Sequence, residues 1–324
     1  MILCCGEALI DMIPAPVEGS GETGFVPHAG GAVFNTAIAL GRLGMQAGLL
    51  SGISTDFFGQ QLCQTLERSR VDTSCLIRAD RPSTLAFVHL TNGHASYSFF
   101  DENSAGRMLS IDEIPPIPDE VSAMFFGGIS LASEPGADAY AALMLAEAGR
   151  RATMIDPNIR PGFIRDAARY RARLGGMIAA ADIVKISDED LDWLVPGTAP
   201  IAEKLRRVGA ADAALVIVTR GGQGATACLR DGAEVSVPAR PVEVVDTVGA
   251  GDTFNAGVLA SLSRQRVLSK PALAALQPET VRRALEFGAA VAAVTVSRAG
   301  ANPPWLDELT GALHDAAFGD ADGS

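Results

Sequence analysis

The sequence offers little cysteine chemistry and no excess of positive charge. Its five cysteines form no CxxC pair, which argues against a disulfide framework and against a zinc site. The net charge of −12 argues against a broad nucleic-acid-binding face and against an anionic membrane surface. No apolar run is long enough to span a membrane, and no basic segment precedes the apolar N-terminus. We therefore expect a cytoplasmic protein whose partners are neither nucleic acids nor membranes.

Two common nucleotide-binding patterns are also missing. The chain contains no GxxxxGK[ST] loop, and no GxGxxG pattern follows its first apolar run. The second absence argues against a nicotinamide-dependent oxidoreductase, whose dinucleotide rests on such a loop. Any phosphate-binding site must therefore be built from a different pattern.

Apolar segments alternate with amphipathic ones along most of the chain. ILCCGEALIDMI at 2–13 predicts a first buried strand with polar residues at its end, and NTAIALGRLG at 35–44 predicts a helix. Hydrophobic residues make up 48% of the chain, enough for a substantial core. The β-α-β-α order predicts an α/β fold with helices on the faces of an open sheet. Further along, STLAFVHL and ASYSFF around Asn92-Gly93 predict a hairpin, which we interpret as an accessory flap.

DTVGAGDTFNAG at 246–257 combines a glycine turn with the start of a predicted helix. Gly249, Ala250 and Gly251 are small, so backbone N–H groups and the helix dipole can attract an anion there. Asp252 follows in the first turn, where it can accept a proton from a hydroxyl close to that anion. This combination suits phosphoryl transfer to an alcohol. We expect the helix N-terminus to hold the pKa of Asp252 low; the alternative interpretation is an ordinary capped turn.

The same stretch closely resembles the second signature of the PfkB-type, or ribokinase-like, carbohydrate kinases. AGGAVFNTAIALGRLG at 29–44 resembles their first signature, and the two follow in the order that the family requires. The resemblance implies that residues 1–324 form a single domain, a doubly wound three-layer α/β/α sandwich. A small β lid would come mainly from residues 12–28 and 82–102. The resemblance also implies an ATP-dependent sugar kinase that uses Mg²⁺, and a monovalent cation such as K⁺ is common in the family.

By this resemblance, several residues gain roles in sugar binding and catalysis. Asp252 is the expected base on the acceptor hydroxyl, and it also contacts the sugar. Asp11, expected at the end of the first strand, would accept sugar hydroxyls; the alternative is that it caps the strand. Gly30 and Gly31 would let the sugar approach the backbone. Asn35 is expected to bind vicinal hydroxyls, and the alternative is an N-cap of the following helix.

Two further stretches resemble the family's phosphate- and nucleotide-binding parts. DPNIRP at 156–161 is similar to the DPNxRP stretch of fructokinases and 2-keto-3-deoxygluconate kinases, which makes Arg160 the candidate cation near the phosphoryl group or the substrate. VTRGGQGA at 218–225 resembles the TxGxxG turn that lines the nucleotide. The residues expected at the nucleotide are Lys185, Thr219, Gly221, Gly224, Ala250, Gly251 and Asn302.

The metal ions are expected in two places. VKISDEDL stands where many family members have KxNxxE, a motif associated with Mg²⁺ and phosphate. Ser187 replaces the Asn and Asp190 replaces the Glu, so Asp190 is expected to reach Mg²⁺ through water. Backbone carbonyls near Asp246 and Val248, together with the turn around Ala299, are the expected ligands of a monovalent cation.

The lid sequence YSFFDENSAGRML bears on the choice of sugar. Fructokinases and 2-keto-3-deoxygluconate kinases usually carry aromatic-aromatic-Arg before Ser/Thr-Ala, whereas Asp101 stands at the Arg position here. A sugar acid needs a cation at that point, so Asp101 favours a neutral hexose whose hydroxyls it accepts. Phe99 is expected to cover the sugar ring. Fructose is therefore the expected substrate, and 2-keto-3-deoxygluconate is the alternative.

Two expectations concern the class of protein and its assembly. A non-catalytic sensor of sugar or nucleotide could share the fold, but it would not need a base beside the anion hole, so Asp252 argues against it. Exposed edges of lid strands often pair with those of another protomer. We therefore expect a homodimer formed through the lid.

Overall fold

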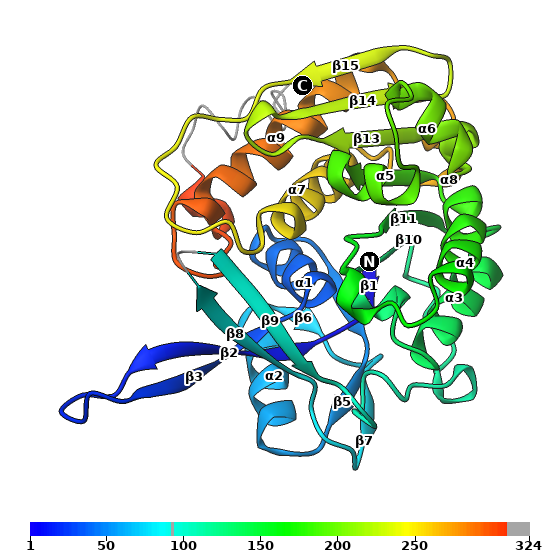
Figure 1. The fold of residues 1–324 in the computed structure, drawn as a ribbon. Coiled ribbons are helices and arrows are strands. Elements are labelled where there is room, and N and C mark those ends of the chain that lie inside the picture. The colour runs from blue at the N-terminus through cyan, green and yellow to red at the C-terminus, as the bar shows by residue number, and fades with distance from the viewer. Residues whose placement is uncertain (92–93, 310–324) are drawn as a thin grey trace.

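The computed structural model describes residues 1–91 and 94–309, whose arrangement is shown in Figure 1. The Asn92-Gly93 turn lies outside the described residues. The strands on either side of it, β8 (Leu85–Thr91) and β9 (His94–Phe100), pair antiparallel as the sequence predicts. Within the described part of the chain, none of the helices combines the length and the apolar character needed to cross a membrane.

A nine-stranded sheet forms the centre of the molecule, in the order β15-β14-β13-β12-β11-β10-β1-β4-β6. Neighbouring strands from β13 to β6 pair parallel, whereas β14 pairs antiparallel with β13 and β15. Strands covered by helices on both faces are apolar on both sides, which explains runs such as ILCC. The strands are β1 (Ile2–Cys5), β4 (Ala47–Leu50), β6 (Val71–Asp72), β10 (Ala123–Gly127), β11 (Ala152–Asp156), β12 (Ile183–Ser187), β13 (Leu215–Thr219), β14 (Ala225–Leu229) and β15 (Glu234–Val237).

Helices cover both faces of this sheet and enclose two hydrophobic cores. Successive side chains of a strand point to opposite faces, so Cys4 packs into one core and Cys5 into the other. One core is shared with α1 (Ala32–Arg42), α2 (Phe57–Arg68), α7 (Ala250–Arg264), α8 (Lys270–Leu273) and α9 (Pro278–Val296). The other is shared with α3 (Gly136–Glu147), α4 (Ala167–Ala180), α5 (Asp188–Leu194) and α6 (Ile201–Arg207). The predicted three-layer α/β/α sandwich is confirmed.

A smaller four-stranded sheet, in the order β3-β2-β8-β9, projects from the body as a lid (Figure 1). It adds β2 (Leu9–Pro16) and β3 (Thr23–Gly30) to the β8–β9 hairpin, and β5 (Gly52–Ser54) pairs separately with β7 (Ile77–Ala79).

The run at residues 2–13 is therefore two strands, and placing Asp11 at the end of the first strand was wrong. The chain leaves the central sheet at Gly6, where a Cβ would lie 2.5 Å from Val33 Cγ2 of α1. This close approach is a tertiary contact, and apolar residues resume at Ala8 beyond Gly6 and Glu7. Asp11 therefore belongs to β2 and to the lid.

Candidate active site

The glycine turn before α7 is shaped by both backbone conformation and close packing. Gly249 has a φ of 78° and directly precedes Ala250, the first residue of α7. A Cβ at Gly249 would also lie 2.7 Å from the Ala301 Cβ. Glycine satisfies both the left-handed backbone and this contact. The turn therefore presents the first backbone N–H groups of α7, which have no partners within the helix.

Asp252 lies in the first turn of α7 and is 7% exposed. Asn35 Nδ2 donates to its Oδ2 at 3.0 Å, and Asn158 Nδ2 donates to its Oδ1 at 3.4 Å. Thr36 Oγ1 donates to its backbone carbonyl at 3.1 Å. Two segments that are distant in the sequence, at 35–36 and at 158, thus hold Asp252 beside the glycine turn.

The helix predicted from residue 35 begins at Ala32 in the structure. Asn35 therefore lies inside α1, where its side chain reaches Asp252. The helix starts at Ala32, and Ala32 N donates to Glu7 Oε1 at 2.9 Å. A distant carboxylate thus satisfies the helix start, and the alternative interpretation of Asn35 as the N-cap is wrong. Asn35 is buried in the first turn, with its amide directed at the candidate base.

The pKa of Asp252 is raised to about 7, first by burial and then by the charges of Asp156 and Glu7. The hydrogen bond from Asn35 and the charge of Lys185 act in the opposite direction. The expectation of a low pKa was wrong, because removing water from a buried carboxylate outweighs the favourable helix N-terminus. A carboxyl group with a pKa near neutrality is a stronger base than an ordinary aspartate.

Asp11 and Gly30 meet where the lid joins α1. A Cβ at Gly30 would lie 2.2 Å from Asp11 Oδ2, so glycine at this position makes room for the carboxylate. Burial raises the pKa of Asp11 to about 6. Gly31 has a φ of 108°, and a Cβ there would lie 3.0 Å from the carbonyl oxygen of Glu7. Both glycines are thus required by the fold of this junction, whatever binds against them.

A buried hydrogen-bond network around Asp156, close to the glycine turn, was not predicted from the sequence. Asp156, the last residue of β11, accepts hydrogen bonds from Lys185 Nζ at 2.8 Å and from Asn255 Nδ2 at 2.7 Å. Lys185 Nζ would also lie 3.5 Å from a Cβ on Gly251, so a cation lies next to the candidate anion hole. The signal was available, because DPNIRP places Asp156 at the carboxyl end of a buried strand, where α/β sheets bind ligands.

Glu7 is a second residue that the sequence reasoning passed over. Its Oε1 accepts from Ala32 N at 2.9 Å, and its Oε2 accepts from Ser130 N at 3.2 Å. It is 7% exposed, and burial raises its pKa. Glu7 therefore joins the start of α1 to the segment that follows β10. Its position directly after an apolar strand was the available signal.

Asp190 contacts the DPNIRP loop, and Arg160 is part of that loop. Asp190 Oδ1 accepts from Ile159 N at 3.0 Å, and Ser187 caps α5 by accepting from Asp190 N at 3.0 Å. Burial raises the pKa of Asp190 to about 6, and the charge of Asp156 acts in the same direction. The Arg160 side chain is exposed and donates to the carbonyl of Ile159 at 3.1 Å. Asp190 therefore shapes the loop that carries Arg160.

Asp101 has a different environment from the one expected. Its two carboxylate oxygens accept from Arg107 Nη1 at 2.9 and 3.0 Å, and Ser133 Oγ donates to Oδ2 at 3.2 Å. The expected role of Asp101 toward the sugar did not include a charged partner, and the structure pairs it with Arg107. Phe99 packs against Phe163, with 4.2 Å between the ring centroids.

The turn between β13 and β14 has the tight geometry expected of a nucleotide-binding loop. Thr219 ends β13, and Arg220 N donates to the Gly224 carbonyl at 2.8 Å. Gly224 has a φ of 90°, and a Cβ there would lie 2.1 Å from the Val237 carbonyl oxygen. Gly221 also has a positive φ, 47°. The two glycines thus permit a compact turn at the carboxyl end of the sheet.

Asp246 joins the two turns expected to supply carbonyl ligands to a monovalent cation. Its Oδ1 accepts from Val248 N at 3.0 Å, and its Oδ2 accepts from Gly300 N at 2.8 Å. Asn302 follows in the second turn, is exposed, and accepts a hydrogen bond from Arg42 Nη1 at 2.8 Å. The structure therefore brings the two turns together, while Asn302 is turned toward α1.

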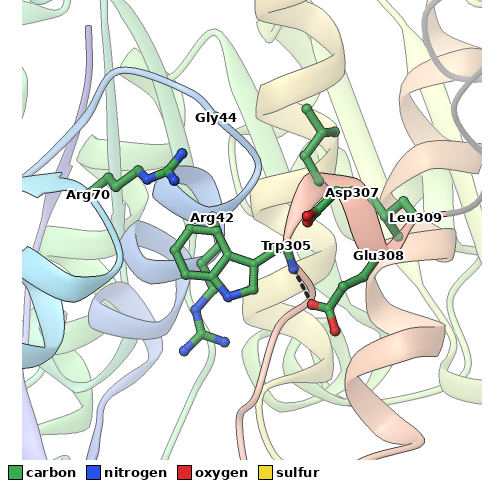
Figure 2. Close-up of a pocket in the computed structure, with 8 residues that line it drawn as sticks. Arg42, Gly44, Arg70, Trp305, Asp307, Glu308 and Leu309 are labelled. Atoms are coloured by element: carbon green, nitrogen blue, oxygen red, sulfur yellow. Dashed lines mark hydrogen bonds between the residues drawn. The ribbon is translucent and has the colours of Figure 1, made fainter.

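A surface hollow of about 810 Å³ lies away from Asp252, at the end of α1 (Figure 2). Trp305 lies there near two guanidinium groups, 5.6 Å from Arg42 and 5.1 Å from Arg70. Arg42 also donates to the carbonyl of Pro303 at 2.7 Å. These contacts anchor the segment after α9 to the body, which is a structural role.

A buried carboxylate beside a glycine-rich helix start, on a three-layer α/β/α sandwich with a lid, is the arrangement expected of a carbohydrate kinase. Comparison with known families supports this class directly. The family described as "pfkB family carbohydrate kinase" matches residues 1–308, and the chain belongs to this family.

Curated relatives within the family include several fructokinases. The chain is 49% identical to a fructokinase of Rhizobium leguminosarum bv. trifolii, with 87% of this chain and 86% of that protein covered. It is 32% identical to a fructokinase of Klebsiella pneumoniae, with 95% of this chain and 97% of that protein covered.

Solved structures of fructokinases also match this chain over nearly its whole length. Fructokinase from Xylella fastidiosa with bound ATP superposes with a TM-score of 0.86 at 30% identity, covering 95% of this chain and 96% of that chain. A fructokinase double mutant from Vibrio cholerae O395, bound to fructose, ADP and a potassium ion, gives a TM-score of 0.81 at 25% identity and covers 98% of this chain and 97% of that chain.

Proposed function

We propose that this protein is an ATP-dependent fructokinase, which transfers the γ-phosphoryl group of ATP to a hydroxyl of fructose. The observation that carries the proposal is the buried carboxylate of Asp252, held by Asn35 and Asn158 beside the glycine turn at 249–251. The fructokinases among its relatives support the choice of sugar.

Asp252 takes the proton of the acceptor hydroxyl in this mechanism. As the hydroxyl oxygen forms its bond to the γ-phosphorus, the bond from that phosphorus to the bridging oxygen of ADP breaks, and ADP leaves. The proton passes to the Asp252 carboxylate, whose pKa of about 7 matches this task near neutral pH. Asn35 and Asn158 keep the carboxylate oriented during the transfer.

The developing charge on the phosphoryl group is stabilised by groups already in place. The backbone N–H groups at 249–251 form the anion hole at the helix N-terminus. Lys185 lies next to Gly251, held by its ion pair with Asp156, and adds positive charge at the same point. Arg160 is the further candidate cation, on a loop shaped by Asp190.

Fructose binds between the lid and the start of α1 in this proposal. Asp11 accepts hydrogen bonds from sugar hydroxyls, and Gly30 and Gly31 keep the adjacent backbone accessible. Asn35 contributes its amide to the same sugar, and Phe99 covers one face of the ring. Asp101 stays paired with Arg107 and affects the sugar through that pair.

ATP binds along the carboxyl end of the sheet, over the turn that contains Thr219, Gly221 and Gly224. Mg²⁺ is carried mainly by the phosphates of ATP and by water, so it needs few protein ligands. Asp190 fits this role through water, because it is a buried carboxylate close to Lys185 and Asp156.

The two turns whose carbonyls would bind K⁺ are held next to each other by Asp246. K⁺ prefers neutral carbonyl oxygens, and Asp246 fixes the turns at Val248 and Gly300 that would supply them. The ion would rigidify the segment that leads into the anion hole. We also propose that the protein acts in the cytoplasm as a homodimer joined through the lid.

A panel of sugars with ATP tests the proposal. We expect fructose to be phosphorylated with the highest kcat/KM, ahead of 2-keto-3-deoxygluconate. Asp252→Asn should lower kcat by about 10²- to 10⁴-fold while fructose and ATP still bind. Asp119→Asn, which changes an exposed carboxylate, serves as the matched control.

Three outcomes would count against the proposal in different ways. Normal turnover by Asp252→Asn would remove the base assignment. A large preference for the sugar acid would favour 2-keto-3-deoxygluconate kinase over fructokinase. Binding of sugar and ATP without turnover by the unaltered protein would favour a sensor over an enzyme.

A further inference from the structure

Asp101, which directly follows β9, forms an ion pair with Arg107, and both residues line a small cavity near the lid. The cavity has a volume of about 20 Å³, enough for one water molecule. Six of its nine lining residues have polar side chains: Glu7, Thr84, Asp101, Arg107, Ser130 and Ser133.

Asp101 and Arg107 form a closed pair within this cavity. Arg107 Nη1 donates to both carboxylate oxygens of Asp101, at 2.9 and 3.0 Å, and Arg107 Nε donates to the Glu134 carbonyl at 3.0 Å. The Arg107 side chain is 13% exposed and the Asp101 side chain is 10% exposed. Little water reaches either charge, so each depends on the other for compensation.

This ion pair is linked by packing to the residues expected at the sugar. Ile129 lines the same cavity, and it packs together with Leu9 and Phe99. Leu9 Cδ1 would in turn lie 3.7 Å from a Cβ on Gly30. Two apolar side chains, Ile129 and Leu9, therefore lie between the cavity and the junction of lid and α1, and an uncompensated charge acts far across such an apolar layer.

We propose that the Asp101–Arg107 pair is a specificity determinant, in which Asp101 prevents Arg107 from attracting the carboxylate of a sugar acid. The pair presents a neutral polar surface to the sugar site and so favours a neutral hexose. The proposal rests on the function proposed above and names the substrate class that this site rejects.

Removing the charge of Asp101 and removing that of Arg107 should have opposite effects on the binding of a sugar acid. Without the Asp101 charge, Arg107 is a poorly solvated cation that gains from any carboxylate placed nearby. Without the Arg107 charge, Asp101 is a poorly solvated anion that repels the same carboxylate. A purely structural pair would instead impair both classes of substrate alike.

The test compares 2-keto-3-deoxygluconate with fructose in Asp101→Asn, Arg107→Gln and the double variant. The readout is the ratio of kcat/KM for the acid to that for fructose, together with the inhibition constant of the acid against fructose phosphorylation. In Asp101→Asn we expect the ratio to rise, or the inhibition constant to fall, at least about tenfold. In Arg107→Gln we expect the opposite change, and in the double variant a return toward the unaltered protein.

Asp138→Asn is the matched control, because it breaks ion pairs with Arg169 and Arg173 on the α3–α4 surface. Its ratio should not change. Should Asp101→Asn fail to fold, Arg107→Gln and the double variant still decide between opposed and equal effects.

A folded variant set in which acid and fructose change in parallel would overturn the proposal. That result is distinct from failure of the proposed function, which would show as poor fructose turnover by the unaltered protein.

Discussion

Asp252 shows that the role proposed for this carboxyl group carries a cost to stability. It is held by two amide side chains beside the glycine turn, yet its burial makes ionisation unfavourable. The folded protein therefore binds a proton at this position more tightly than the unfolded chain does. Stability associated with this group is present at low pH and is lost as the pH rises from about 4 to about 7.

We predict that Asp252→Asn stabilises the protein above pH 7. The substitution removes the buried charge, whose ionisation costs on the order of 4 kcal/mol when a pKa rises by about three units. The gain in unfolding free energy over the unaltered protein should be small at pH 4.5 and largest at pH 8, measured by denaturant titration at both values.

The control for this prediction is the exposed carboxylate of Asp119. The stability difference between Asp119→Asn and the unaltered protein should not vary with pH over the same interval. If Asp252→Asn gains no more stability at pH 8 than at pH 4.5, the raised pKa is contradicted.

At the scale of elements, the turn that leads into α7 is coupled to the turn after α9. Asp246 accepts one backbone N–H from each turn, through Val248 and Gly300. Gly249 also packs against Ala301. The glycine turn proposed as the anion hole is therefore supported from outside its own segment, and an ion bound between the two turns would affect the start of α7.

We predict that Asp246→Ala weakens the stimulation of activity by K⁺. The substitution leaves the Val248 and Gly300 N–H groups without this acceptor and loosens both turns. Their carbonyls are then held less firmly for the ion, so kcat at saturating K⁺ should fall several-fold and the K⁺ concentration for half-activation should rise. Initial rates measured with K⁺ replaced by a bulky organic cation provide the comparison.

The exposed carboxylate of Asp307 provides a matched site in the same part of the chain. Asp307→Ala should leave the K⁺ response unchanged. An unaltered response in Asp246→Ala would argue against a cation between these turns.

At the scale of the whole molecule, the lid carries a group of aromatic side chains that are partly exposed to solvent. Phe87 contacts Phe25 at 5.0 Å and Phe100 at 5.5 Å between ring centroids. Phe25 is 41% exposed and Phe100 is 57% exposed, on the edge strands β3 and β9 of the lid sheet. Apolar side chains on strand edges are typical of surfaces that pair with another chain.

We predict that Phe100→Asp shifts the protein from dimer to monomer, because it places a charge in the proposed contact. Sedimentation velocity over a range of concentrations measures the change. Leu145→Asp alters a residue that is similarly exposed, at 53%, but lies on α3, and it should leave the mass unchanged. A monomeric unaltered protein, or a dimeric Phe100→Asp, would contradict assembly through the lid.

The sequence predicted the larger architecture well because that architecture follows from local patterns. Alternating apolar strands and helices required helices on both faces of a sheet, and STLAFVHL with ASYSFF required an antiparallel pair. The boundary at Gly6 was not predicted, because the close approach of α1 at Val33, which leaves no room for a Cβ on residue 6, is a contact between segments distant in the sequence. Asp11 was therefore assigned to the wrong strand.

By itself, the sequence determined the glycine turn at 249–251 and a carboxylate directly after it, because backbone freedom and helix starts are properties of adjacent residues. Only the tertiary structure decided that Asn35 holds Asp252, that Asp156 pairs with Lys185, and that Arg107 neutralises Asp101. The physical reason is that burial and charge depend on everything that surrounds a group in space. The pKa of Asp252 therefore lies near neutrality, although its position in the sequence predicted a low value.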